Sequence, residues 1–167
     1  MAKLKIVTDE APLRRISRPV DKITPRILTL LSDMAETMRD AQGVGLAAPQ
    51  VNILRRVVVI EAVEGDLLEL INPEIIETSG EQTGPEGCLS LPDVDGIVTR
   101  PDYVKIKAMD KTGAVREYEG TGLLARAMCH EIDHLDGILY PDKAQKMYTK
   151  EEFEEMLMKK AEEEGQS

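Results

Sequence analysis

Aromatic residues, cysteine and histidine are scarce in this chain. Its 167 residues include no tryptophan, one phenylalanine, two cysteines and two histidines. Two cysteines cannot form the disulfide framework of a small secreted protein, and isolated cysteines in a cytosolic protein are more often buried, metal-binding or catalytic. With so few aromatic rings, the core must be built from aliphatic and methionine side chains.

Long hydrophobic runs and an excess of positive charge are also missing. No apolar segment approaches the roughly 20 residues of a membrane-spanning helix, and the first residues lack the apolar core of a secretory signal. Lysine and arginine number 21 against 31 acidic residues, which gives a formal net charge of −10. Because sequence-independent nucleic-acid binding needs clustered cations, this charge argues against DNA as a partner. We expect a cytoplasmic protein that binds neither DNA nor membranes.

The rest of the composition is that of a globular domain. Hydrophobic residues make up 42% and charged residues 31% of the chain. The length suits one domain, and no repeat, low-complexity linker or composition break divides it. Residues 1–167 are therefore expected to form a single domain.

Three helices are expected from apolar spacing and capping signals. A capped start at Thr24 and apolar residues at three- and four-residue spacing predict a helix over 25–41. Residues 121–136 are apolar nearly all round, which is typical of a buried helix. Residues 149–164, rich in glutamate, predict a surface helix. Its apolar stripe consists of Phe153, Met156 and Leu157.

Strand-like segments lie between these helices, whereas the first 20 or so residues predict irregular structure. Asn72 and Pro73 separate two of the strands, and a turn at 110–113 joins the last two into a hairpin. The expected strands are 55–61, 67–71, 74–78, 103–109 and 114–119. This order predicts an α+β fold, with antiparallel sheets packed around the buried helix and with an N-terminal and a C-terminal helix.

The two histidines are His130 and His134, with Glu131 between them in the segment HEIDH. Residues four apart on a helix share one face, so both imidazoles can bind one metal ion. Glu131 points to the side of that pair, where it can reach a water on the metal. A purely structural pair of buried histidines would instead need partners for four ring nitrogens.

An open metal site needs a third protein ligand, and no third histidine exists. Tyr140 stands where a longer histidine-rich pattern would have one, so a thiolate or a carboxylate remains. Cys129 points about 100° away from His130 around the helix and is interpreted as a small buried residue. Cys88 lies in the glycine-containing segment EGCLS, which can bend to present both a side chain and a backbone N–H.

A third segment, GVGLAAPQ at residues 43–50, has two glycines and a terminal amide. One interpretation is a helix-to-strand turn followed by a packed strand. The other is backbone exposed at Gly45 for pairing with an extended peptide, with the Gln50 amide as a fixed donor.

The segments GVGLAAPQ, EGCLS and HEIDH, in this order and spacing, resemble those of peptide deformylase in its compact bacterial type. The resemblance covers nearly the whole chain and implies one catalytic domain over 1–167, a metallo-hydrolase that acts on a formamide C–N bond. It implies removal of the N-formyl group from the formyl-methionine of new polypeptides, with release of formate. The native metal of the family is usually Fe²⁺, with Zn²⁺, Ni²⁺ or Co²⁺ as substitutes.

The resemblance also implies a role for each matching residue. Cys88, His130 and His134 would ligate the metal, and Glu131 would be the general acid/base. The Gln50 side chain and the Leu89 backbone N–H would form the oxyanion hole. The residues expected to bind the substrate, whose methionine side chain would enter an apolar pocket, are Val44, Gly45, Gly87, Leu123, Arg126 and Ala127.

Three charged residues near these motifs carry further expectations. Arg126 lies four residues before His130, so its alkyl stem is expected at the pocket rim and its guanidinium in solvent. Glu86 and Arg100 match positions that pair in the family and are expected to brace the Cys88 loop. The alternative is an ordinary surface salt bridge, worth under ~1 kcal/mol.

The chain departs from its relatives at two places. Asp95 stands where some have a basic residue near the peptide-binding rim, which leaves the preference after methionine open. The C-terminal helix is net acidic, whereas in some relatives a basic one docks on ribosomal RNA. We therefore expect formyl-methionyl nascent peptides as partners, at most a weak transient contact with the ribosome, and a monomer.

Two other functions stay open on the residues alone. A zinc endopeptidase would combine HEIDH with a downstream glutamate, such as Glu151 or Glu155, and would not need Cys88. A structural metal site would be closed by Cys88, Cys129 and the two histidines. The direction of Cys129 and the unused Glu131 argue against that second alternative.

Overall fold

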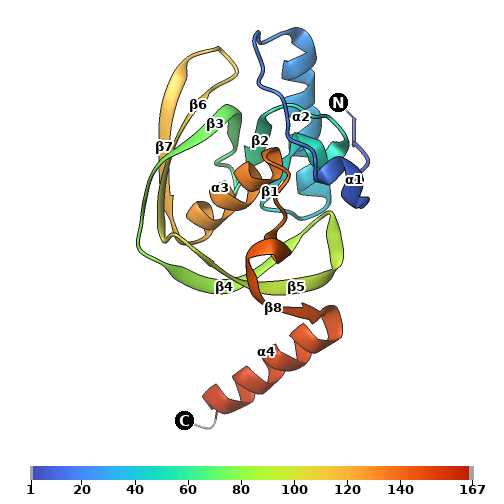
Figure 1. Ribbon diagram of the computed structural model, residues 1–167, viewed down its shortest axis with the longest axis vertical. Coiled ribbons are helices and arrows are strands. Elements are labelled where there is room, and N and C mark those ends of the chain that lie inside the picture. The colour runs from blue at the N-terminus through green and yellow to red at the C-terminus, as the bar shows by residue number, and fades with distance from the viewer. Residues whose placement is uncertain (1, 166–167) are drawn as a thin grey trace.

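A computed structural model describes residues 2–165 (Figure 1). The helices are α1 (Glu10–Leu13), α2 (Pro25–Asp40), α3 (Gly122–Leu135) and α4 (Lys150–Gly165), with 3₁₀ turns at Ala48–Val51 and Tyr140–Lys143. The strands are β1 (Gly45–Ala47), β2 (Val57–Ile60), β3 (Leu68–Ser79), β4 (Gln82–Cys88), β5 (Leu91–Arg100), β6 (Tyr103–Met109), β7 (Val115–Thr121) and β8 (Ala144–Thr149).

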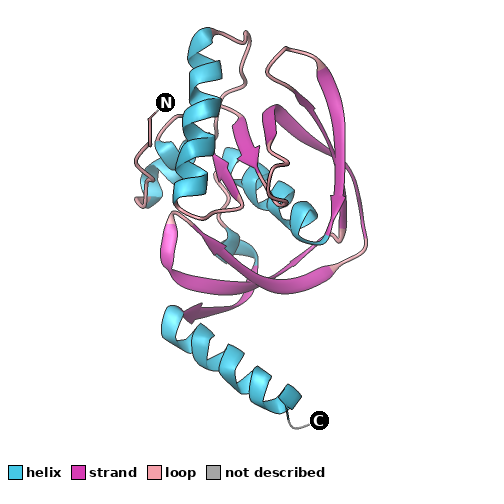
Figure 2. Ribbon diagram, turned by 180° about the vertical axis from the view of Figure 1, so that it is seen from behind, coloured by secondary structure: helices cyan, strands magenta, loops and turns pink. Residues whose placement is uncertain are grey.

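The strands form two antiparallel sheets. One has five strands in the order β1-β2-β3-β6-β7, and the other has three in the order β4-β5-β8. Helix α3 contacts strands of both sheets and lies in the space that they enclose (Figure 2). The predicted α+β fold, with antiparallel sheets around a buried helix, is confirmed.

Strand β2 shows how both faces of the larger sheet are filled. All four of its residues are fully buried. Because successive side chains of a strand point to opposite faces, Val58 and Ile60 pack with α3, while Val57 and Val59 pack with α2. Helices therefore cover both faces of this strand, which explains why it reads as an unbroken apolar run. The aliphatic and methionine-rich core expected from the composition is present.

The two long helices of the body begin and end close to their predicted bounds. Thr24 caps α2 by accepting a 3.4 Å hydrogen bond from the Ile27 backbone N–H, and Pro25 occupies the first turn. The helix ends at Asp40 rather than at 41. Helix α3 spans Gly122–Leu135 against a predicted 121–136, and all its residues from Ala125 to Ile132 are buried.

Two predictions about the other elements are wrong. The segments 67–71 and 74–78 are not separate strands, because β3 runs through Asn72 and Pro73 with a register shift against β6. Asn72 has a φ of 53°, and its side-chain amide exchanges hydrogen bonds of 2.8 and 2.9 Å with the backbone of Val20. The first 20 residues are not wholly irregular, because they include the short helix α1.

The C-terminal helix projects away from the rest of the molecule (Figures 1 and 2). It contacts β8 and β5, and none of its described residues is buried. The predicted apolar stripe is only partly covered, since Leu157 is 47% exposed while Phe153 packs on Tyr148.

Within residues 2–165, no helix has the length and apolarity that a membrane span requires.

Candidate active site

Three side chains with metal-binding chemistry converge between the sheets. His130 and His134 project from α3, and Cys88 ends β4. Their ligand atoms all lie within 4.8 Å of one another, and Cys88 Sγ is 3.3 Å from His134 Nε2. A tetrahedral divalent ion with ordinary bond lengths would separate a sulfur from a nitrogen ligand by ~3.6 Å. The donor set and its spacing therefore fit a single metal ion with an open fourth position.

The two elements bring these ligands together in different ways. On α3 the four-residue spacing of the histidines places both rings on one face, with centroids 5.0 Å apart. Strand β4 pairs with β5 through a register shift between Glu86 and Cys88. Such an irregularity changes the direction of the side chain that follows it. The bend expected in the EGCLS segment is therefore the tip of a β-hairpin.

Glu86 lies behind the metal-binding group and holds His130. Its Oε1 is 2.7 Å from His130 Nδ1, which directs Nε2 of that ring toward the other ligands. Arg100 donates two hydrogen bonds of 2.9 and 3.0 Å to the same carboxylate and a third, of 2.7 Å, to Asp133. Although burial opposes ionisation, the hydrogen bonds from His130 and Arg100 hold the pKa of Glu86 at about 2.

The pairing of Glu86 with Arg100 was expected, and its position in the fold settles the nature of the contact. The side chains of both residues are less than 5% exposed, so this is an interior ion pair and not the surface salt bridge of the alternative.

The expectation for the Arg126 guanidinium is wrong. The helical spacing correctly places the residue at the pocket, but the side chain is buried and turns away from solvent. Its Nη1 donates hydrogen bonds of 2.6 Å to Glu86 Oε2 and 3.1 Å to the Val98 carbonyl. The guanidinium of Arg126 binds the interior carboxylate of Glu86 and does not extend into water. Glu86 therefore accepts hydrogen bonds from the guanidinium groups of both Arg100 and Arg126.

Glu131 faces the same space. The residue is buried, and its Oε1 has no hydrogen bond within the described residues. Burial raises the pKa of this carboxyl to about 7, against the opposing effect of the nearby His130 charge. A carboxyl group that titrates near neutrality and has a free oxygen suits general acid/base chemistry.

Gly45 leaves the space that the Glu131 side chain occupies. A Cβ on Gly45 would lie 2.6 Å from Glu131 Oε2 and 2.9 Å from its Cγ. We predict that Gly45→Ala displaces the carboxylate and lowers kcat by about 100-fold, the typical effect of a ~1 Å misplacement. Gly84→Ala is the control, because a Cβ there meets only Arg126 at 3.5 Å. Unchanged kcat in Gly45→Ala would contradict this account.

Gln50 is fixed beside Cys88 by the 3₁₀ turn Ala48–Val51. It is almost fully buried, and its Oε1 accepts a 3.0 Å hydrogen bond from the Ala47 backbone N–H. Its Nε2 lies 3.4 Å from Cys88 Sγ and 3.2 Å from Ser90 Oγ. Sequence reasoning gave no role to Ser90, although it lies within the EGCLS motif. The amide is thus a rigid donor, as expected.

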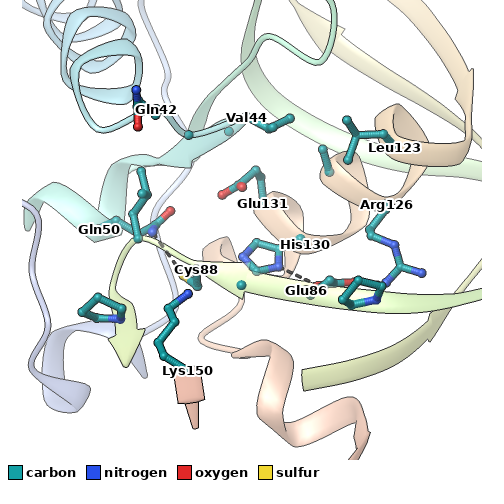
Figure 3. Close-up of a pocket in the computed structure, with 17 residues that line it drawn as sticks. Gln42, Val44, Gln50, Glu86, Cys88, Leu123, Arg126, His130, Glu131 and Lys150 are labelled. Atoms are coloured by element: carbon teal, nitrogen blue, oxygen red, sulfur yellow. Dashed lines mark hydrogen bonds and ion pairs between the residues drawn. The ribbon is translucent and has the colours of Figure 1, made fainter. Parts of the chain in front are cut away.

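A cavity of about 440 Å³ opens beside these groups (Figure 3). Every residue predicted to bind substrate lines it, as do Gln50, Glu86, Cys88, Leu89, His130 and Glu131. Sequence reasoning did not assign five further lining residues to the pocket. These are Gln42, Gly43, Pro85, Pro92 and Lys150.

The additional metal ligands that the two alternative functions require are not part of this site. Cys129 lies on α3 and is buried in the core, as predicted for a small interior residue. The metal-binding group found among residues 2–165 contains neither Cys129 nor Glu151 nor Glu155. The structure therefore gives no support to a closed four-ligand site or to a downstream glutamate ligand.

Comparisons with known proteins agree on one family. The family model described as polypeptide deformylase matches residues 3–150. The peptide deformylase of Lachnoclostridium phytofermentans is 60% identical over 146 residues, which are 86% of this chain and 90% of that protein. A peptide deformylase structure from Legionella pneumophila has a TM-score of 0.82 and 39% identity over 87% of each chain. One from Thermotoga maritima has a TM-score of 0.82 and 36% identity, covering 86% of this chain and 99% of its own. The chain belongs to the polypeptide deformylase family.

Proposed function

We propose that the cavity beside Cys88 is where this chain carries out the reaction of its family. That reaction is hydrolysis of the N-formyl group from the formyl-methionine of newly made polypeptides, with release of formate. One observation carries the proposal. Three potential metal ligands lie within 4.8 Å of one another, next to a buried carboxylate that has a free oxygen.

In this proposal Cys88, His130 and His134 hold the metal, as their chemistry and spacing support. A bound divalent cation supplies Lewis-acid polarisation of the formyl carbonyl and acidifies a water molecule. Glu86 keeps the His130 ring in the tautomer whose Nε2 is free to bind, by accepting from Nδ1.

Glu131 acts as the general base and then the general acid. It takes a proton from the attacking water and passes it to the leaving amine of methionine. Its buried position in the cavity and its Oε1, which has no hydrogen bond within residues 2–165, support this role.

Gln50 and Leu89 stabilise the negative charge that develops on the formyl oxygen. The Gln50 amide is held in place through Ala47 and Ser90, so it need not reorganise during the reaction. The Leu89 backbone N–H is the proposed second donor, on the segment directly after Cys88.

Peptide binding uses the remaining lining residues. Val44, Leu123 and Ala127 offer an apolar surface for the methionine side chain, while Gly45 and Gly87 leave backbone accessible to an extended peptide. The stem of Arg126 lines the cavity, although its charge is directed at Glu86.

We propose Fe²⁺ as the resident metal, one ion per chain, with Zn²⁺, Ni²⁺ or Co²⁺ able to replace it. Two imidazoles and a thiolate suit all of these ions. Cys88 is not fully buried, so an oxidant can reach the thiolate and convert it to an oxygenated form that binds poorly.

The cellular setting that we propose follows from the substrate. Residues 1–167 act as one catalytic domain, a monomer in the cytoplasm, of which residues 1 and 166–167 lie outside the described part. The exposed glutamates of α4 favour at most a weak, transient contact with the ribosome, because ribosomal RNA is itself an anion.

Formate release by anaerobically prepared, iron-loaded protein tests the proposed function. A short formyl-Met peptide should yield formate, and removal of the metal by a chelator should abolish this. Cys88→Ala should lose both stoichiometric metal and activity, whereas Cys129→Ala, which removes a thiol from the core, should keep both. No formate from the iron-loaded chain, or full activity and metal content in Cys88→Ala, would overturn the proposal.

A further inference from the structure

Lys150 is the exposed charge at the mouth of the catalytic cavity. The other charged or titratable lining side chains outside Cys88 are buried, namely Glu86, Arg126, His130 and Glu131. The side chain of Lys150, by contrast, is 55% exposed. Figure 3 shows it extending from the start of α4 toward Cys88. Among the residues that line the cavity, Lys150 therefore carries the accessible positive charge.

Asp95 holds this lysine in place. Lys150 Nζ lies 3.1 Å from Asp95 Oδ2, and the side chain of Asp95 is only 11% exposed. In the antiparallel pairing of β5 with β8, Asp95 lies opposite Tyr148, two residues before α4 begins at Lys150. Its other oxygen lies against Gly87, where an added Cβ would approach Oδ1 to 2.8 Å. The ion pair thus joins the start of α4 to the segment that presents Cys88.

The contact with Asp95 leaves the donors of Lys150 available. Asp95 Oδ2 accepts no hydrogen bond from the described residues, so the 3.1 Å contact is an ion pair without hydrogen-bond geometry. An ammonium group has three N–H donors. These donors can turn toward an acceptor that enters the cavity mouth without breaking a protein hydrogen bond.

The position of Lys150 relative to the apolar lining decides which part of a peptide it meets. Leu123 and Val44 lie on the far side of Cys88 and His130 from Lys150 in Figure 3. With methionine held at the apolar side, the next residues leave through the mouth. Each extended residue spans ~3.3–3.6 Å, so the second and third residues come within reach of a lysine side chain.

We propose that Lys150 is a specificity-determining residue that favours formyl-methionyl peptides with a carboxylate side chain at the second or third residue and disfavours lysine or arginine there. The inference rests on the proposed function of the cavity. Because the ion pair formed with substrate is solvent-exposed, the preference is modest: about 2- to 5-fold in kcat/KM between acidic and basic peptides, and weaker at high salt.

The test compares C-terminally amidated formyl peptides that differ in one residue. Glutamate, glutamine or lysine is placed at the second or third residue, with formyl-Met counted as the first, and kcat/KM for formate release is measured at low and high salt. The wild-type chain should prefer glutamate over lysine at one or both positions. Lys150→Glu should reverse the order. Lys159→Glu makes the same charge change further along α4 and should retain the wild-type order.

The results distinguish a failure of the proposed role of Lys150 from a failure of the proposed function. Equal kcat/KM for all the peptides, or the same order in Lys150→Glu as in Lys159→Glu, overturns the role of Lys150 while leaving the proposed function intact. No formate from the neutral glutamine peptides overturns the proposed function itself, and the role of Lys150 with it.

Discussion

Replacing Glu131 by glutamine is expected to lower kcat by about 10²–10⁴-fold, the usual contribution of a positioned general acid/base. The amide keeps the shape of the side chain but can neither accept nor return the proton. Metal content should stay stoichiometric, because Glu131 lies beside the ligand group and is not part of it. The free energy of unfolding should stay the same or rise, since the variant removes a buried carboxylate whose Oε1 has no hydrogen bond within residues 2–165.

Formate release, metal analysis and thermal unfolding on one preparation check this result. The matched control is Asp136→Asn, the same chemical change just after α3, where the carboxylate is half-exposed and pairs with Arg56 at 3.0 Å. This control should keep nearly full activity. If Glu131→Gln retained more than about a tenth of wild-type kcat, the assignment of the acid/base role to Glu131 would be wrong.

The helices of the body could be predicted because each has a local signal. The Thr24 cap and the regular spacing of Ile27, Leu31, Met34 and Met38 gave α2 to within a residue. The same periodicity placed His130 and His134 on one face of α3, and with them the larger part of the metal-binding group.

Strand β3 could not be predicted fully because its course depends on distant residues. Asn72 and Pro73 are a strong local turn signal, yet the Asn72 side chain binds the Val20 backbone and the strand continues with a register shift. Helix α4 (Lys150–Gly165) is the predicted surface helix, within a residue of the expected 149–164, and Leu157 of its apolar stripe is 47% exposed.

Arg126 shows the same limit at the level of the site. Helical spacing places the residue on the correct face, but the direction of a long side chain depends on which partner is within reach. That partner is Glu86, forty residues earlier in the chain, on a strand that α3 meets only in the folded protein. Lys150 was missed at the cavity for a similar reason, because only the β5–β8 pairing brings α4 to its mouth.

Replacing Glu86 by glutamine is expected to destabilise the fold by about 3–5 kcal/mol, because it leaves buried cations without their carboxylate. Arg100 would retain Asp133, but Arg126 would retain only the Val98 carbonyl. Chemical denaturation should show a lower midpoint with an unchanged slope. The affinity for metal should fall by about 10–100-fold, since His130 loses the group that orients its ring.

Removing the Arg126 guanidinium as well should restore part of the stability lost in Glu86→Gln. Arg126→Leu in the Glu86→Gln background takes away the guanidinium that lacks a charged partner, so the double variant should unfold at higher denaturant than Glu86→Gln alone. Metal affinity should stay low in both, because the carboxylate that orients His130 is absent from each. Glu10→Gln, which removes one of two exposed partners of Arg14, should change stability by less than about 1 kcal/mol. If Glu86→Gln were as stable as the Glu10→Gln control, the two arginines would not need Glu86 for the stability of the fold. If the double variant were less stable than Glu86→Gln, Arg126 would stabilise the fold through its packing rather than its charge.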